Sequence, residues 1–481
     1  MNLPALKRVG VVLVLAIGSL WAPRAGAASD YAVVVSAQTA ADPGWQAVVA
    51  ALVSKHHATT LRFTNSVTEA LPALQKQFPR YACFVATPAE ATREFVAQVS
   101  RLTRQLDEDP YTDCFWGILT GYDAANALAI ARQKTPLTIR KVAGATEVAL
   151  DMVEEGVWYC ELNRNKLVRK VRGGAPVQLK GPDDTTEALV RVLNEERPDL
   201  FVASGHASEH DWMLGYRYPD GFFKHADGHL FGADTQNRKF TVASPNPKIF
   251  MPVGNCLTGH LVGRDCMATA WMNSAGVCQM LGYTVTSWYG YAGWGVLDYF
   301  VEQPGRYTFN EAFFANQHAL IYRLKTCFPE MLDQSPDAGK SAAVQPKVGA
   351  AATAAGLTAD DARGLVYDRD VVAFYGDPAW VARMADRPKA FEQTLTVKKG
   401  TFTFEVKPNR GADSFKPINT NGSQRGGRPF IAYLPHRVRD VKVVAGAELN
   451  PVITDDFILV PNPGQCDPAK SYRVVFTASP I

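Results

Sequence analysis

The chain has 481 residues, of which 47% are hydrophobic and 20% charged, and its net charge is +3. Basic and acidic residues are interleaved, so the charge gives no basis for binding nucleic acid or a membrane surface. A chain of this length is too long for one hydrophobic core, and we therefore expect two or three domains.

The first residues have the pattern of a secretory signal peptide. A basic pair at 7–8 precedes an apolar run at 9–22, and the small residues AGA follow at 25–27. A basic head, a hydrophobic middle and small residues before the cut define such peptides. At about 14 residues the run is short for a membrane span, which needs roughly 20. We expect cleavage of 1–27 after Ala27 and a secreted or periplasmic chain with no integral membrane segment.

Eight cysteines are scattered along the chain, unlike the dense spacing of a small disulfide-stapled protein. An oxidising compartment allows disulfides, but if one cysteine is a free nucleophile, at least one of the others stays unpaired. Cys83 and Cys278 lie in strand-like apolar runs, where we expect them to act as small buried hydrophobes.

From residue 31 the chain alternates between strand-like and helix-like segments. The strands are apolar on both faces, which is typical of a parallel sheet covered by helices. We assign 28–145 to an N-terminal α/β subdomain, with strands at 31–36, 60–64 and 80–87 and helices at 43–56, 67–77 and 91–106. A second α/β subdomain at 146–387 has predicted strands at 199–204, 248–253 and 277–285 and helices at 185–196, 264–273 and 310–325.

The remaining segments have other compositions. Residues 335–363 are rich in Ala, Gly, Ser and Pro and predict a flexible surface loop. After Pro388 come short alternating strands separated by Gly, Asn, Asp and Pro. Several such strands within about 90 residues are typical of a β-sandwich. We expect an immunoglobulin-like β-sandwich at 388–481, with little in it that could do chemistry.

Two predicted strands end in the same way, and both are followed by a reactive side chain. In DLFVASGH the strand runs into Gly205 and His206, and in KIFMPVGNC the next strand runs into Gly254 and Cys256. In open parallel sheets, ligands collect beyond the carboxyl ends of the strands. The glycines let the backbone turn sharply and leave room for a substrate chain. We therefore expect His206 and Cys256 to share one rim of the sheet.

The residue types predict a cysteine peptidase. A thiol becomes a strong nucleophile when a neighbouring imidazole takes its proton, so Cys256 would attack a peptide carbonyl with His206 as base. His206 would then protonate the leaving amine. The resulting oxyanion needs backbone N–H donors, which the glycine turns can supply. We expect a protein or peptide substrate and no cofactor for the chemistry.

The ordered set of motifs resembles the gingipain-type peptidases and, more distantly, the caspases and legumains. A histidine about 50 residues before the cysteine is a feature of caspases. The segments YTDCFWG (111–117), GRDCMATAWMNSAG (263–276) and FYGDPAW (374–380) also match, and the last resembles the segment that closes the family's catalytic domain. The resemblance implies caspase/gingipain-like parallel sheets flanked by helices in two subdomains, followed by a β-sandwich.

The resemblance also implies particular site residues. The backbone N–H groups of Ala207 and Cys256 would form the oxyanion hole. This chain has Ala207 where the family usually has glycine, and alanine does not favour the same backbone angles. Structural calcium is a further expectation, since carboxylate-rich loops such as 107–109 and 360–361 suit a hard cation.

Further residues near the two motifs allow more than one role. Three acids are candidates to orient the histidine or to face a cationic substrate side chain, and their alternative role is ordinary surface charge: Asp113, Glu209 and Asp211. Three aromatic residues could wall the cleft or simply pack in a loop: Trp288, Tyr291 and Trp294.

Two rival interpretations remain for the whole site. Four histidines form two His-x-x-x-His pairs that could bind zinc, although they lie in a Gly-, Pro- and Asp-rich loop rather than on a helix: His206, His210, His225 and His229. The chain could also be a catalytically silent scaffold of the same fold, used for binding or surface display.

Overall fold

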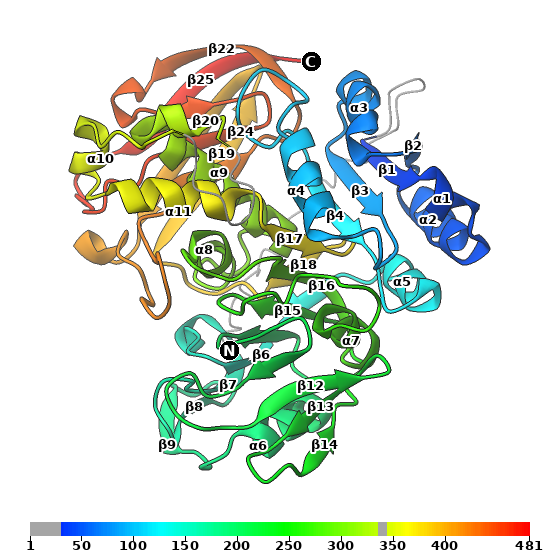
Figure 1. The fold of residues 1–481 in the computed structure, drawn as a ribbon. Coiled ribbons are helices and arrows are strands. Elements are labelled where there is room, and N and C mark those ends of the chain that lie inside the picture. Colours follow the sequence, from blue (N-terminus) through cyan, green and yellow to red (C-terminus); the bar gives the residue numbers. More distant parts are fainter. Residues whose placement is uncertain (1–29, 335–343) are drawn as a thin grey trace, which may run out of the picture.

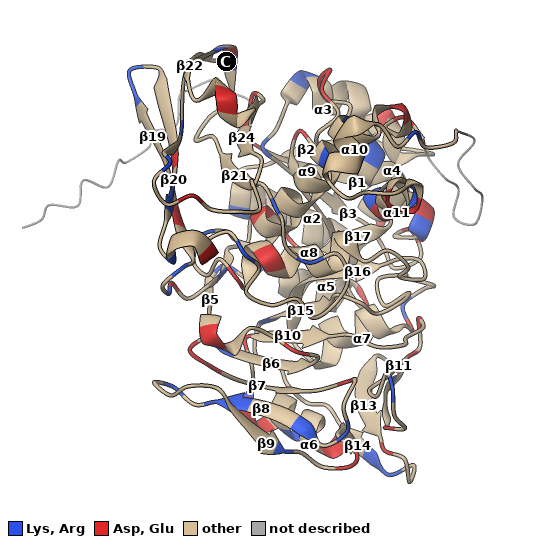
Figure 2. Ribbon diagram, turned by 90° about the vertical axis from the view of Figure 1, so that its left-hand side faces the viewer, with Lys and Arg blue, Asp and Glu red and all other residues tan. Residues whose placement is uncertain are grey.

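The computed structural model describes residues 30–334 and 344–481, so the expected signal peptide lies outside the described part. The chain forms a mixed α/β structure around one large, mostly parallel sheet with helices on its faces (Figure 1). In the described residues, no helix is both long and apolar enough to cross a membrane. Figure 2 shows basic and acidic residues interspersed along the ribbon, as the small net charge suggests.

The large sheet has twelve strands in the order β2-β1-β3-β4-β17-β16-β15-β10-β6-β7-β8-β9. Their bounds are β1 (Tyr31–Ser36), β2 (Thr59–Phe63), β3 (Tyr81–Val85), β4 (Phe115–Leu119), β6 (Lys141–Ala145), β7 (Glu155–Tyr159), β8 (Lys166–Lys170), β9 (Val177–Lys180), β10 (Leu200–Ala203), β15 (Lys248–Pro252), β16 (Val277–Tyr283) and β17 (Val372–Tyr375).

The two expected α/β halves are thus continuous. β17 runs parallel to β4 and antiparallel to β16, and so joins the N-terminal strands to those of the second half. β6 falls within the predicted N-terminal subdomain, yet it pairs with β10 and β7 of the second half. Pairing between strands distant in sequence decides this arrangement, and the local pattern of a strand contains no signal for it.

Helices cover both faces of this sheet. Those of the N-terminal half form two groups, because α1 and α5 contact α2 while α3 and α4 contact a short turn at 67–70. Right-handed crossovers place such groups on opposite faces. The helices are α1 (Ala37–Ala41), α2 (Pro43–His56), α3 (Leu71–Gln77), α4 (Arg93–Leu102), α5 (Ala124–Ala131), α6 (Thr186–Arg191), α7 (Met267–Ser274), α8 (Tyr291–Phe300), α9 (Phe309–Cys327), α10 (Ala350–Ala354) and α11 (Ala359–Arg369).

The predicted flexible loop at 335–363 contains helical segments. Residues 335–343 lie outside the described part, but α10 and the start of α11 fall within the range. At the start of α11 the Thr358 side chain accepts from the Asp361 N–H, and the Asp361 carboxylate accepts from the Thr358 N–H. Alanine is a strong helix former, so the Ala-rich composition favoured short helices where we expected a linker.

Small sheets complete the fold. A four-stranded antiparallel sheet extends from the histidine turn and consists of β11 (Asp211–Met213), β12 (Phe222–Ala226), β13 (His229–Ala233) and β14 (Lys239–Thr241). A two-stranded sheet pairs β5 (Leu137–Ile139) with β18 (Ala382–Met384). At the C-terminal end (orange to red in Figure 1) two antiparallel sheets lie together: β19 (Phe391–Lys398), β20 (Thr401–Pro408), β25 (Tyr472–Pro480) and β22 (Val438–Ala445), with β21 (Phe430–Tyr433), β24 (Phe457–Val460) and β23 (Val452–Ile453).

Buried ion pairs fasten distant segments to one another. Asp377, in the GDP segment after β17, accepts hydrogen bonds from Tyr31, Lys55 and His56 at 2.7–2.8 Å. Burial raises its pKa, but His56 and Lys55 more than offset this and lower it to about 2. Asp298 of α8 likewise pairs with Arg425 of the C-terminal module at 2.6 Å. Buried charge pairs therefore join the second α/β half to the N-terminal half and to the C-terminal module.

Candidate active site

His206 and Cys256 follow neighbouring parallel strands. β10 and β15 pair along their whole length, and each ends a few residues before its reactive side chain. Beyond the last strand residues, the Val253 N–H still donates to the Ala203 carbonyl at 2.9 Å. Because parallel strands end at the same edge of a sheet, His206 and Cys256 lie on one rim.

The two glycines before these residues are required by close contacts. Gly205 has φ +136°, a region that side chains rarely allow, and a Cβ there would lie 2.7 Å from the Met213 carbonyl. At Gly254 the backbone angle is ordinary, but a Cβ would lie 2.6 Å from the Ser204 hydroxyl oxygen. The turn after β15 therefore packs directly against the turn after β10, which leaves no room for a side chain at Gly254.

The Cys256 sulfur is half-buried and has one polar partner. The Ser287 N–H donates to it at 3.2 Å, from the loop that follows β16. Leu257, the next residue, has φ +57°, so the chain leaves the cysteine in a left-handed turn.

The His206 ring is exposed and lies against one aromatic neighbour. The ring of Tyr216 stacks on it, with centroids 4.6 Å apart and planes 24° from parallel. Tyr216 is itself anchored, since its N–H donates to the Glu161 carbonyl at 2.8 Å. The sequence pattern did not identify Tyr216, because the contact depends on how the segment after β11 folds back.

Residues 206–213 form a tight hairpin that leaves one N–H free. Ala207 faces Trp212 across the hairpin. The hydrogen bonds that close the hairpin are made by the residues on either side of this pair, and the Met213 N–H donates to the His206 carbonyl at 2.8 Å. In such a pair the N–H points away from the opposite strand. Within the described residues, neither the Ala207 N–H nor the Cys256 N–H has an acceptor. Both are thus available to an outside oxygen.

The three candidate acids have other partners. Asp113 accepts from the Leu106 N–H at 2.8 Å, Glu209 pairs with His260 at 2.8 Å, and Asp211 accepts from the Ser208 hydroxyl at 2.7 Å. Burial raises the pKa of Glu209, but its hydrogen bonds, including the one from His260, lower it overall. In the described part of the chain, none of the three contacts the His206 ring.

Glu161 is an acid at this rim that sequence reasoning missed. It follows β7 after one residue and is 4% exposed. Its Oε1 accepts from the Thr146 hydroxyl at 2.6 Å, while its buried Oε2 has no hydrogen-bond partner among the described residues. Burial raises the pKa of this carboxyl, and the nearby Thr146 and Asn421 lower it in part. The sequence did contain a signal for Glu161, namely a charged residue just after a buried strand.

The aromatic run after β16 divides into one exposed ring and two buried ones. Trp288 is 57% exposed and meets Tyr367 edge-on, with centroids 5.7 Å apart. Tyr291 is buried under the Arg428 guanidinium, 3.7 Å from its ring centroid. Trp294 is buried beside Gly254. Only Trp288 of the three is exposed enough to border a cleft; the other two pack inside.

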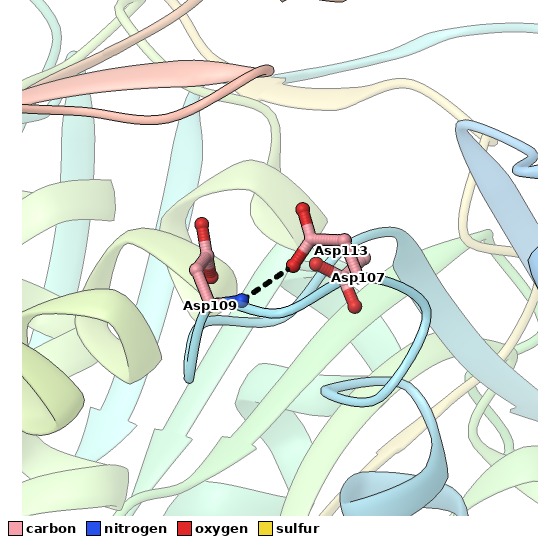
Figure 3. Close-up of side chains that lie close together, drawn as sticks. All are labelled: Asp107, Asp109 and Asp113. Atoms are coloured by element: carbon pink, nitrogen blue, oxygen red, sulfur yellow. Dashed lines mark hydrogen bonds between the residues drawn. The ribbon is translucent and has the colours of Figure 1, made fainter.

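An acidic cluster lies in the loop between α4 and β4, and β4 is three positions along the sheet from β15, which leads to Cys256. Asp107, Asp109 and Asp113 bring carboxylate oxygens within 4.8 Å of one another, and the Asp109 N–H donates to Asp107 at 2.8 Å (Figure 3). Burial, and next the Asp107 charge, raise the pKa of Asp113 to about 9 and that of Asp109 to about 6. Oxygen ligands of this kind suit calcium. The second loop in which we expected calcium, 360–361, has other contacts, because Asp360 pairs with Arg363 and Asp361 caps α11.

The four histidines of the zinc interpretation do not assemble. In residues 30–334 and 344–481, the Asp107 cluster is the one group of three or more potential ligands close enough to hold a metal. Two of the histidines do meet, with the His210 Nδ1 and the His225 Nε2 3.3 Å apart. Burial, and next His210, lower the pKa of His225.

The remaining cysteines show no second nucleophile site. All eight are free thiols, so the structure contains no disulfide within its described residues. Cys83 is buried on β3 and Cys278 is half-buried on β16, in keeping with packing roles. Cys266 is buried at the start of α7 beside Thr269, and burial raises its pKa.

Comparison with known proteins gives one match. No protein-family model matches the chain, and no curated protein matches it significantly. Among solved structures, the chain is similar to the crystal structure of the Arg-specific cysteine proteinase gingipain R, over 94% of each chain, with a TM-score of 0.45 and 11% sequence identity. The chemistry of the site has to be argued from its own residues.

Proposed function

We propose that the protein is a secreted cysteine endopeptidase that uses Cys256 as nucleophile and His206 as base. The observation that carries this proposal is the rim shared by the two side chains at the ends of β10 and β15, where the N–H groups of Ala207 and Cys256 have no acceptor among residues 30–334 and 344–481. A nucleophile, a base and two unpaired donors are the components that acyl transfer needs.

The reaction would proceed through a thioester. His206 takes the thiol proton, and the Cys256 sulfur forms a bond to the substrate carbonyl carbon while the carbonyl oxygen becomes an oxyanion. The N–H groups of Ala207 and Cys256 would hold that oxygen. The C–N bond then breaks as the amine takes the proton from His206. A water molecule, deprotonated by His206, hydrolyses the thioester and restores the thiol.

We assign Glu161 to substrate binding. Its buried Oε2 has no hydrogen-bond partner in the part of the chain that the structure describes, and a buried carboxylate oxygen without a partner is costly. A lysine or arginine side chain of the substrate would supply the missing donors. Exposed Trp288 would border the same cleft. We therefore expect the enzyme to prefer a basic residue at one position of its substrate.

Labelling with a peptide electrophile tests the assignment of the nucleophile. A peptidyl chloromethyl ketone with a basic side chain should modify Cys256, as read by mass spectrometry of tryptic peptides. The variant Cys256→Ala should lose both labelling and peptide cleavage with an unchanged circular dichroism spectrum. Cys327→Ala is the matched control, because Cys327 is also half-buried but lies at the end of α9, and it should keep both.

A catalytically silent scaffold is the second candidate. It is favoured by one observation, namely that the described residues show no direct hydrogen bond between His206 and Cys256. In peptidases without substrate such bonds are often long and tighten only in the complex. A Cys256→Ala protein that still cleaves at the wild-type rate would refute the dyad. Absence of labelling in the wild-type protein would support the scaffold.

A further inference from the structure

His210 and His225 form a cross-strand pair beside the proposed active site. In the β11–β12 ladder Asp211 pairs with Lys224, so the next step of the register sets His210 opposite His225. Residues directly opposite in an antiparallel pair have Cβ atoms about 4.5–5.5 Å apart. The end of this ladder therefore places His210 and His225 side by side.

The distance between the two rings suits a metal ion. The His210 Nδ1 and the His225 Nε2 lie 3.3 Å apart, and the ring centroids 5.5 Å. Two nitrogen ligands bound at about 2.0–2.1 Å to a tetrahedral zinc ion are themselves about 3.3–3.4 Å apart. A slight rotation of the exposed His210 ring would turn its Nδ1 lone pair away from the His225 Nε2, so that both nitrogens face one ion.

The surroundings of the pair favour a cation with water as its remaining ligands. The carboxylates of Asp211 and Asp265 lie close enough to act electrostatically on His225. The buried His225 Nδ1 has no hydrogen-bond partner in the described structure, so no contact there fixes the tautomer, and the Nε2 is the nitrogen that faces His210. His210 is exposed, which leaves the pair open to ions and water from solvent.

We propose that His210 and His225 bind a divalent transition-metal ion such as zinc. The ion would link the tip of the hairpin that begins at His206 to β12. Because the Met213 N–H already ties the base of that hairpin to the His206 carbonyl, a second link at the tip fixes the whole segment. Zinc is the probe of choice because it binds imidazole nitrogen and has no redox chemistry.

The test uses the full-length Cys256→Ala protein, so that the proposed nucleophile is not a ligand. Titration calorimetry with zinc chloride should show a site whose affinity falls about 10-fold or more when His210→Ala or His225→Ala is added, since loss even of an outer-shell partner costs about 10- to 100-fold. His229→Ala is the matched control, because His229 is exposed on the same small sheet without touching the pair.

Melting curves provide the second measurement. A ligand that binds only the folded state raises its stability, so zinc should raise the Tm of the Cys256→Ala protein and of its His229→Ala derivative but not of the His210→Ala derivative. His210 is exposed, so its removal should leave the metal-free Tm unchanged. Identical titration curves with and without the two histidines, or no binding at millimolar zinc, would overturn the proposal.

Discussion

The Tyr216 ring lies stacked on His206 with 4.6 Å between centroids, and it is the one aromatic contact of that imidazole in the described structure. Tyr216 is 47% exposed, so its burial contributes little to the core. Its backbone is held by Glu161, and its ring limits the directions in which His206 can turn. In the proposed mechanism His206 transfers protons, which requires a base in a fixed orientation, so the stack would act as a positioning contact.

Removing the ring should therefore impair turnover more than stability. We expect Tyr216→Ala to lower kcat by roughly 10-fold, within the range of up to about 100-fold that small misplacements cost, while Tyr216→Phe keeps the stack and most of the activity. Steady-state kinetics measure the loss of turnover, and melting curves measure any loss of stability. Equal losses in the Phe and Ala variants would contradict a role for stacking.

The strands that lead to His206 and Cys256 were predictable because their signals are local. DLFVAS and KIFMPV are continuous apolar runs, which become buried parallel strands, and each is followed by a glycine that the close contacts require. The same rule, a reactive residue just after a buried strand, also applies to Glu161 after β7. It was overlooked because a single acid has no spacing motif.

Other features depend on contacts that no local pattern encodes. β17 joins the two halves through pairing with residues 280–283, about a hundred positions earlier in the chain. The Tyr216 stack and the His210–His225 pair exist only once the β11–β12 hairpin has formed. The Ala-rich range at 335–363 misled for another reason, since the same composition is typical of linkers and of short helices.

The Asp107 cluster predicts a dependence of stability on pH. Folding raises the pKa of Asp113 to about 9 and that of Asp109 to about 6, above the unfolded value of about 3.9. The folded state thus binds more protons than the unfolded state between these values, so its stability falls as pH rises from about 4 to 9. Asp113→Asn removes the charge and keeps an acceptor for the Leu106 N–H. This variant should melt higher than wild type at pH 8, with little difference at pH 4.

Calcium should act on the same cluster. By pairing with the carboxylates it would remove their repulsion, so adding calcium at pH 8 should raise the wild-type Tm and a chelator should reverse the change. Asp113→Asn should respond less. Asp360→Asn is the control, because Asp360 is paired with Arg363 on the surface, and it should respond as wild type does. A wild-type Tm that ignores both calcium and chelator would refute calcium binding.

Glu161 should determine a preference for basic substrates. A hydrogen bond to a charged group contributes about 1.5–3 kcal/mol, which corresponds to roughly 10- to 100-fold in kcat/KM. Glu161→Gln should lower kcat/KM by that factor for peptides with arginine or lysine before the scissile bond, and much less for peptides with leucine there. A peptide library profiled with both proteins provides the measurement. If the two profiles coincide, Glu161 only packs against Thr146.

The last prediction concerns the backbone at Ala207. The Ala207 N–H makes no internal hydrogen bond in the described structure. Replacing Ala207 with proline therefore removes a donor that the fold does not use. If this N–H holds the oxyanion, a folded Ala207→Pro variant should lose about 100-fold or more in kcat, the usual scale for one such donor. KM should change little, because the charge develops only in the transition state. Ala207→Gly keeps the N–H and widens the accessible backbone angles, so it should retain or raise activity.

Circular dichroism must first establish that the proline variant is folded. A folded Ala207→Pro protein with full turnover would place the oxyanion donor elsewhere on the rim and leave the Cys256 N–H as the remaining candidate.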